Sequence, residues 1–157
     1  MVNKMAKKKN TIVIAAVTCC GKTYFSQNSG KKKVLDTDSI EEFKSEKLYK
    51  NRVKLFINRI KDSLSQYDYI LITATNQSLR ELNTNGIPYV LVYPEDSQEC
   101  VIEWYNRSVN RNEGWKLNSL MFRQLQDLCK HDKRAVQHIR LSKDQYLSDV
   151  ISKIAVK

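Results

Sequence analysis

A short run near the N-terminus constrains the fold more than any other feature of the chain. Residues 11–17 are mainly apolar and rich in β-branched side chains. Three residues separate the end of this run from Gly21-Lys22-Thr23. A buried strand that leads into Gly-Lys-Thr is typical of a loop that wraps phosphate groups with its backbone N–H groups, in the pattern G-x-x-x-x-G-K-[ST]. Ala16 stands where the first glycine of this pattern belongs. Because alanine is small, we expect the loop to form in spite of this substitution.

The motif predicts a role for each of its residues. Gly21 lets the backbone turn and approach a phosphate closely. Lys22 places a positive charge on the phosphate oxygens, and Thr23 offers its hydroxyl to Mg²⁺. The helix that follows presents its positive N-terminal end to the same anion. The residues expected to bind a nucleotide are Val17, Thr18, Cys19, Cys20, Gly21, Lys22, Thr23 and Tyr24.

The same run has a second interpretation. Residues 7–9 are lysines, and together with the apolar residues 12–17 they resemble a signal peptide, with Cys19 as a lipid-anchor site. The apolar run is short for a signal, however, and Lys22 follows it too soon. We therefore favour the phosphate-binding loop.

Composition indicates an ordinary globular protein. The 157 residues, 41% of them hydrophobic and 28% charged, suit one domain over residues 11–157 behind a flexible basic tail, residues 1–10. No apolar run is long enough to span a membrane, and the four cysteines show no disulfide or metal spacing, so we expect reduced thiols in the cytoplasm. The net charge of +10 favours anionic partners: nucleotides, phosphorylated metabolites or nucleic acid.

Five expected strands alternate with segments of helical periodicity. The expected strands are residues 11–17, 33–37, 69–74, 88–93 and 136–141. The first expected helix starts at Lys22, and two more follow from Ser39 onward, with a break near residues 49–51. The later expected helices are residues 76–83, 97–110, 117–131 and 142–154. This order predicts the α/β class, with three α/β/α layers around a five-stranded parallel sheet. In such sheets, ligands bind beyond the carboxyl ends of the strands.

Two acids follow the second expected strand. The spacing of Asp36 and Asp38 puts both carboxylates on the same side of an extended segment. We expect Asp36 to join Thr23 in binding Mg²⁺. We expect Asp38 to contact the substrate and accept a proton from an attacking hydroxyl. The alternative is that Asp38 and Ser39 are simply the start of a helix.

Two arginines lie four residues apart, Arg107 and Arg111, which puts both on one helix face. Arginines in a lid can meet the charge on a transferred phosphoryl group and exclude water, so we expect both to be catalytic. A solvent-exposed basic helix is the alternative. Arg80 follows the third strand and is expected to contact an acceptor phosphate, although a surface role fits it equally well.

The third expected strand ends in Thr73-Ala-Thr75, with no acid. The usual second nucleotide motif has an aspartate here that orients Mg²⁺. Two explanations stay open: Asp36 takes over this role, or water links Thr73 or Thr75 to the metal.

Together these motifs resemble the small P-loop kinases of the adenylate kinase-like superfamily. The resemblance rests on the loop at 16–23, Asp-Thr-Asp at 36–38 and Arg-x-x-x-Arg at 107–111. The last two are also similar to shikimate and gluconate kinases, although no Gly-Gly-Gly run follows the third strand. The segments 92–95 and 103–107 look more like nucleotide-kinase-like proteins of bacteriophages. The resemblance implies ATP with Mg²⁺ as phosphoryl donor and a helical lid around residues 97–130; a phage origin would place the protein in the host cytoplasm.

Three functions remain open from the sequence. The first is transfer of the γ-phosphoryl group of ATP to a small anionic or hydroxyl-bearing acceptor of nucleoside or nucleotide type. The second is phosphorylation of nucleic acid, at a strand end or a modified base, which the charge of +10 suggests. The third is a non-catalytic ATP-binding module, which the incomplete loop motif suggests. The oligomeric state is not indicated.

Overall fold

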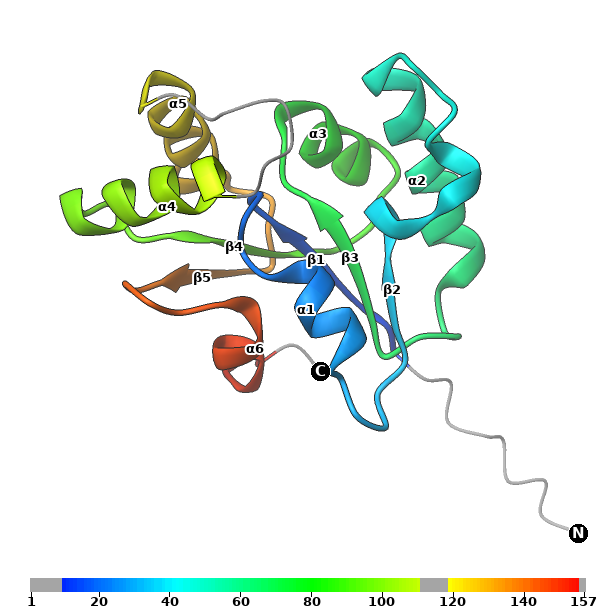
Figure 1. The fold of residues 1–157 in the computed structure, drawn as a ribbon. Coiled ribbons are helices and arrows are strands. Elements are labelled where there is room, and N and C mark those ends of the chain that lie inside the picture. Colours follow the sequence, from blue (N-terminus) through cyan, green and yellow to red (C-terminus); the bar gives the residue numbers. More distant parts are fainter. Residues whose placement is uncertain (1–9, 111–118, 156–157) are drawn as a thin grey trace, which may run out of the picture.

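Five strands form one parallel sheet in the order β2-β3-β1-β4-β5 (Figure 1). The computed structural model describes residues 10–110 and 119–155, so the expected tail lies almost entirely outside the described residues. The strands are β1 (Ile12–Ala16), β2 (Val34–Asp36), β3 (Tyr69–Thr73), β4 (Val90–Pro94) and β5 (Gln137–Leu141). The helices are α1 (Lys22–Gln27), α2 (Tyr49–Ser63), α3 (Asn76–Thr84), α4 (Gln98–Asn110), α5 (Ser119–Lys130) and α6 (Leu147–Val150). The predicted α/β class and the five-stranded parallel sheet are confirmed.

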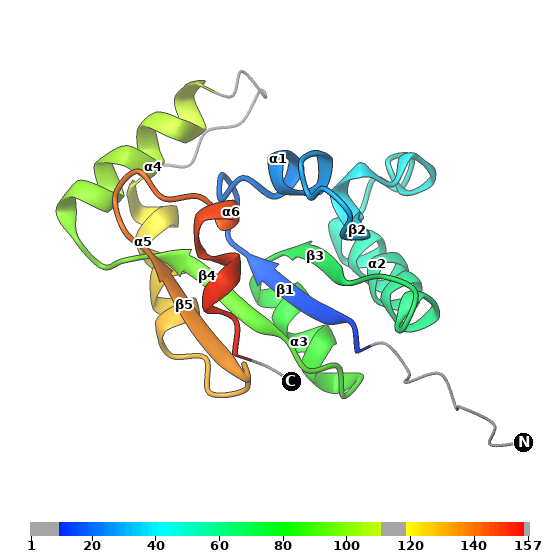
Figure 2. The ribbon, with the colours of Figure 1, turned by 90° about the horizontal axis from the view of Figure 1, so that it is seen from below.

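Helices cover both faces of the sheet, because each parallel connection must cross over it. Helices α1 and α6 lie on one face, and α2, α3 and α5 lie on the other (Figure 2). The strands at the centre are apolar throughout, and β4 is buried at every position. This is the pattern of strands that are covered on both faces.

The register brings the carboxyl ends of the central strands to one edge. Ala16, the last residue of β1, pairs with Thr73 of β3 and with Val92 of β4. Asp36, the last residue of β2, pairs with Leu71, two residues before the end of β3. The loops after β1, β2 and β3 therefore start near one another, at the edge where ligands bind in sheets of this kind.

In the sheet, β3 lies between β1 and β2, so β2 does not pair with the strand that leads into the loop after β1. The segment after β2 crosses the end of β3 instead. The Thr37 hydroxyl donates to the Leu71 carbonyl at 2.9 Å and fixes this crossing. The side chain of Asp36 nevertheless lies beside that of Thr23, with 3.5 Å between the two oxygens.

The helix predicted to begin at Ser39 is wrong. Two short 3-10 helices, Thr37–Ser39 and Glu41–Phe43, occupy this segment, and a single helix, α2, begins only at Tyr49. The Asp36 carboxylate accepts from the backbone N–H of Asp38 at 3.2 Å, and the Ser39 hydroxyl donates to the Asp36 carbonyl at 2.7 Å. These local bonds compete with helix formation, as is common for aspartate and serine.

The last helix starts later than predicted, at Leu147 instead of Ser142. Residues 142–146 form a turn in which the Ser142 N–H donates to the Gln145 side chain at 2.8 Å, while Asp144 has a left-handed backbone with φ of 65°. The N–H of Leu147 donates to the Cys20 carbonyl at 2.8 Å. Contact with the loop after β1 therefore sets where α6 begins.

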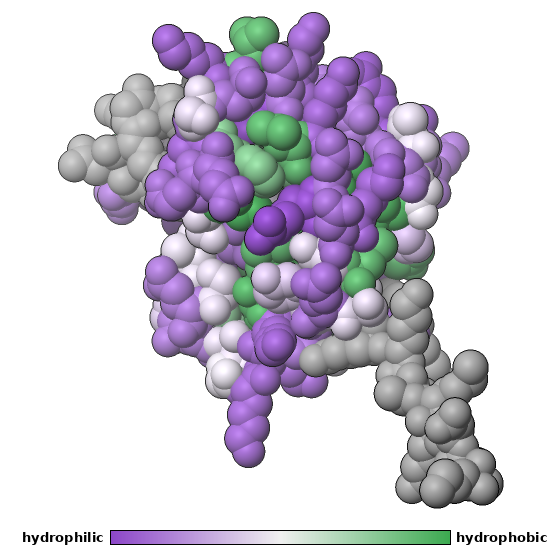
Figure 3. Space-filling view, turned by 90° about the vertical axis from the view of Figure 1, so that its right-hand side faces the viewer, coloured by the Kyte–Doolittle hydropathy of each residue, from purple (hydrophilic) through white to green (hydrophobic). Residues whose placement is uncertain are grey.

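Hydrophilic side chains cover most of the face on the α2 side of the molecule (Figure 3). Exposed lysines of this region include Lys47, Lys50 and Lys54. Among the described helices, none has both the length and the apolar composition that crossing a membrane requires.

Candidate active site

The position of the missing glycine lies in regular strand. Ala16 is fully buried, ends β1 and pairs with strands on both sides. The next residue continues the pattern, since the Val17 N–H donates to the Val92 carbonyl at 3.0 Å. Extended backbone accepts any L-residue. A Cβ is therefore tolerated at residue 16, and the loop itself begins after Val17.

The loop turns through two residues with left-handed backbone, Cys19 with φ of 66° and Gly21 with φ of 84°. Gly21 immediately precedes α1, whose first N–H groups have no partner inside the helix. A Cβ on Gly21 would lie 3.0 Å from a ring carbon of Tyr146. Glycine is thus required at residue 21 both by the backbone conformation and by the close approach of this ring.

Helix α4 and the start of α6 hold the loop by its carbonyl groups. The indole N–H of Trp104 donates to the Thr18 carbonyl at 2.8 Å, and Arg107 Nη1 donates to the Cys19 carbonyl at 3.3 Å. The Cys20 carbonyl accepts from the backbone of Leu147. Three successive loop carbonyls are therefore fixed by residues that lie 86 or more positions away along the chain, which sets the conformation of the loop.

Arg107 is tightly packed and lines the cavity beside the loop. Its guanidinium carbon lies 4.1 Å from the centre of the Trp104 ring and 3.8 Å from that of Tyr146. Arg107 Nη2 pairs with Glu103 and donates to the Gln145 carbonyl at 3.0 Å. Arg107 Nε is buried and has no hydrogen-bond partner among the described residues. The structure thus gives Arg107 a bracing contact with the loop, while Arg111 lies outside the described residues.

Two carboxylates and a lysine meet below the loop. Asp36 is 3% exposed and Lys22 is 7% exposed. Burial raises the pKa of Asp36 above its ordinary value, the Asp38 carboxylate raises it further, and the charge of Lys22 opposes both effects. A cation at this position would stabilise the ionised form of Asp36.

The oxygens of Thr23 and Asp36 fit Mg²⁺. Both are hard donors, and they lie close to each other beside the loop. Among the described residues, no group of three or more His, Cys, Asp or Glu side chains is placed to bind a metal.

An acid does lie at the end of β3, although it belongs to another segment. The Thr73 hydroxyl donates to Asp38 Oδ2 at 2.6 Å. Two residues further on, the hydroxyls of Thr75 and Tyr49 lie 3.0 Å apart. The chain at the end of β3 is therefore tied to the segment after β2 through Asp38 and to the first residue of α2 through Tyr49. The first of these contacts places the Asp38 carboxylate where the sequence of β3 itself has no acid.

One large open cavity, with a volume of about 1520 Å³, joins these features. It exceeds the roughly 300–1,000 Å³ of an ordinary ligand site, so it has room for two small substrates. The predicted site residues that line it are Thr18, Cys19, Gly21, Lys22, Thr23, Tyr24, Asp36, Asp38 and Arg107.

Three of the predicted site residues that the structure describes do not line this cavity. Val17, just before the loop, and Cys20, within it, are buried. Arg80 lies exposed on α3, where Nη2 donates to the Gln77 side chain at 3.2 Å. The structure therefore does not bring Arg80 together with Asp38.

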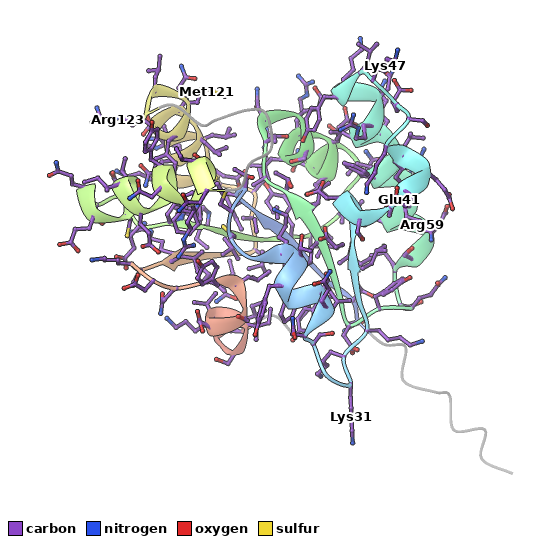
Figure 4. All side chains as sticks on the ribbon, in the orientation of Figure 1. Lys31, Glu41, Lys47, Arg59, Met121 and Arg123 are labelled. Carbon is purple, nitrogen blue, oxygen red and sulfur yellow. The ribbon has the colours of Figure 1, made fainter. Side chains whose placement is uncertain are left out.

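Sequence reasoning missed the residues that close the cavity from α5. Met121, Gln124, Leu125 and Leu128 line it at helical spacing. Figure 4 shows Met121 on α5, on the opposite side of the molecule from Glu41 and Lys47, which precede α2. The apolar periodicity of α5 was visible in the sequence, but periodicity does not tell whether a face packs in the core or lines a cavity. Nothing in the sequence around Tyr146 indicated its contact with the loop.

Comparisons with solved structures show which proteins share this fold. The tunicamycin resistance protein of Deinococcus radiodurans matches with a TM-score of 0.60 and 11% identity, over 94% of this chain and 94% of that one. A gluconokinase from Sinorhizobium meliloti matches with a TM-score of 0.51 and 13% identity, over 94% and 90%. A sugar kinase from Janibacter sp. has a TM-score of 0.49 and 14% identity, over 92% and 91%. No protein-family model matches the sequence, and a search of curated proteins finds no relative. At these identities the likeness concerns the fold, and the chain therefore has a kinase-like α/β fold.

Proposed function

We propose that this protein is a phosphotransferase that moves the γ-phosphoryl group of ATP to an acceptor of nucleoside or nucleotide type. The observation that carries the proposal is the meeting of Lys22, Thr23, Asp36 and Asp38 along one cavity. A lysine and a hydroxyl beside a phosphate loop are suited to bind the phosphates and Mg²⁺ of ATP, the phosphoryl donor. A second carboxylate further along the cavity suits the acceptor. The likeness in fold to a gluconokinase is consistent with this proposal.

Each residue has a defined role in the proposed reaction. The loop N–H groups and Lys22 bind the β- and γ-phosphates. Thr23 and Asp36 would hold Mg²⁺, which supplies charge neutralisation on these phosphates when bound. Asp38 orients the acceptor hydroxyl and accepts its proton as the new P–O bond forms, while the bond from the γ-phosphorus to the β–γ bridging oxygen breaks and ADP leaves with that oxygen.

Helix α4 adjoins the donor side of the cavity through Arg107. We propose that this residue organises the loop, through its bond to the Cys19 carbonyl, in addition to facing the phosphoryl group. The role of Arg111 in a lid stays a prediction, as does contact between Arg80 and an acceptor phosphate.

Replacement of Lys22 by alanine tests the proposal. We expect ATP consumption with an accepted substrate to fall by about a hundredfold or more, because electrostatic stabilisation of the transferred group is lost. The matched control is Lys31→Ala, an exposed lysine that does not line the cavity (Figure 4). Equal turnover in the Lys22 variant and in the wild type would contradict the assignment.

The two other functions predict different results. A non-catalytic ATP-binding module binds ATP and transfers phosphate to none of a broad acceptor panel. A kinase acting on nucleic acid binds DNA or RNA with an affinity that falls steeply with added salt. The reason is that binding of a protein with a net charge of +10 releases counterions from the nucleic acid. The exposed lysines on the α2 side favour the kinase acting on nucleic acid as the second candidate, so DNA and RNA belong in the acceptor panel.

A further inference from the structure

We infer that the acceptor side of the cavity takes an uncharged molecule that combines an apolar ring with a hydroxyl group, such as a nucleoside, in preference to a nucleoside monophosphate or a sugar acid. This inference rests on the proposed function, since it names the chemical class of the acceptor. Four sets of contacts carry it: two apolar walls, a polar end and the pairing of the nearby cations.

The first apolar wall comes from the segment after β2 and from α2. Ile40, Phe43 and Phe56 line the cavity. The rings of Phe43 and Phe56 pack with their centres 5.8 Å apart at an angle of 51°. Because Phe56 is only 4% exposed, it holds the half-buried Phe43 ring in place. A fixed aromatic surface is suited to a flat ring, which packs against it by stacking or by its edge.

The second apolar wall comes from α5. Met121, Leu125 and Leu128 are spaced at i, i+4 and i+7, so they share one face of this helix, and all three line the cavity. Leu125 and Leu128 are half-buried. The two walls belong to different parts of the molecule, α5 at the upper left of the ribbon and the segment before α2 at the upper right (Figure 1). A ring that lies between the walls buries its apolar surface against both of them. A small, fully polar acceptor would leave both walls in contact with water.

The polar end of this region lies at β3. Asp38 is held by Thr73, and the Tyr49 hydroxyl contacts that of Thr75. All four side chains line the cavity. An ionised carboxylate accepts hydrogen bonds only, so Asp38 suits an acceptor that presents a hydroxyl as donor. The hydroxyl would then point toward the phosphate loop while the ring lies between the apolar walls.

Two cations of this region, Arg52 and Lys44, already donate to other groups. Arg52 lines the cavity, but its Nε and Nη2 both donate to the Glu46 carbonyl, at 3.2 and 2.7 Å. Lys44 also lines it and pairs with Glu41 at 2.6 Å. An acceptor phosphate is normally bound by arginines with free bidentate donors. Here these contacts already use part of the donors of Arg52 and Lys44, and an anionic acceptor would also have to approach the Asp38 carboxylate, so an uncharged one is favoured.

Binding measurements on the full chain, made without turnover, test this inference. Calorimetric titration is carried out in the presence of Mg²⁺ and a non-hydrolysable ATP analogue, with nucleosides, the matching 5′-monophosphates, and gluconate as probes. We expect nucleosides to bind at least about tenfold more tightly than their monophosphates, and gluconate not to bind. Phe43→Ala and Leu128→Gln each weaken nucleoside binding about tenfold, which is the usual scale for a lost ring contact. The control is Leu48→Ala, an exposed residue of the same segment that does not line the cavity.

The outcomes separate this inference from the proposed function. Monophosphates or gluconate binding as tightly as nucleosides would overturn the inference, and so would unchanged affinity in both cavity variants; their melting curves report whether each is folded. Turnover is measured separately, with all probes as acceptors and ATP as donor. Phosphorylation of gluconate or of a monophosphate alone would support the kinase and overturn the acceptor class. Nucleoside binding that depends on Phe43, without any phosphoryl transfer, would support the acceptor class and overturn the kinase.

Discussion

The Thr73 hydroxyl donates a hydrogen bond of 2.6 Å to the Asp38 carboxylate, and this bond joins the end of β3 to the segment after β2. It is the contact that supplies an acid at a strand end whose own sequence has none. If Asp38 orients the acceptor, Thr73 is a positioning residue that fixes the direction of its carboxylate.

Thr73→Val removes the hydroxyl and keeps the shape of the side chain. We expect kcat to fall about ten- to a hundredfold, because a misdirected base transfers protons less efficiently. The KM for ATP stays unchanged, since the loop is not altered. Steady-state kinetics check both values. Thr73→Ser keeps the donor and should recover most of the lost kcat; if serine is as poor as valine, the hydrogen bond is not the cause.

Gly21→Ala tests the contact between the loop and α6. The substitution imposes a left-handed backbone on alanine, which costs about 1–2 kcal/mol, and the new Cβ meets the Tyr146 ring at 3.0 Å. Overpacking adds roughly 1–3 kcal/mol. Denaturant unfolding measures the loss.

Gly30→Ala is the matched control, because Gly30 has a φ of 63° and no atom within 4 Å of an added Cβ. We expect Gly30→Ala to be less destabilising than Gly21→Ala by about 1 kcal/mol or more. In a Tyr146→Ala background this difference should shrink. A difference that persists there would mean that the ring is not responsible.

Asp36→Asn tests the electrostatics below the loop. In the unfolded chain Asp36 ionises with its ordinary pKa of 3.8, whereas burial and the Asp38 charge raise its pKa in the folded protein. Between these two pKa values the folded state binds more protons, so the stability of the wild type falls as the pH rises through this window and stays lower above it. Asparagine carries no charge and retains an acceptor for the Asp38 N–H.

The variant should therefore have a higher Tm than the wild type at pH 7, and the difference should vanish below pH 3.8, where Asp36 is protonated in both states. Thermal unfolding between pH 3 and pH 8 measures this. Mg²⁺-dependent turnover should fall in the same variant. A variant less stable than the wild type at pH 7 but not at low pH would show that Asp36 stabilises the fold as an anion, against this expectation.

Arg107→Met removes the brace between α4, the loop and α6. The side chain packs between two rings, bonds the Cys19 and Gln145 carbonyls and pairs with Glu103. We expect a loss of about 2–4 kcal/mol in the free energy of unfolding, because the loss of these buried contacts leaves polar groups without partners. Affinity for ATP should weaken as well.

The matched control is Arg80→Met, since Arg80 is exposed and bonds only a neighbouring side chain of its own helix among the contacts described. Its effect on stability should stay within about 0.5 kcal/mol. Denaturant unfolding of both variants provides the comparison. Similar losses in the two variants would show that the contacts of Arg107 add little to stability.

Local sequence was sufficient for most of the sheet and for the phosphate loop. All five strands were predicted within about two residues of their observed ends. The clearest signals came from β1, β3 and β4, because strands buried on both faces are mainly apolar runs between turn residues. Gly21 and Lys22 lie where the motif places them, at the start of α1. The predictions that failed, the helix at Ser39 and the early start of the last helix, concern polar segments. There, side-chain hydrogen bonds or a distant contact outweigh helical propensity.

By itself, then, the sequence determined the class of fold, the loop and the group formed by Lys22, Thr23 and Asp36, because adjacent residues and apolar periodicity carry this information. Only the tertiary structure decided that Asp38 lies at the end of β3, that Tyr146 covers Gly21, and that α5 forms one wall of the cavity. These arrangements join segments 35 to 125 residues apart. Contacts at such separations depend on how the helices pack against the sheet, and no local pattern of residues records that packing.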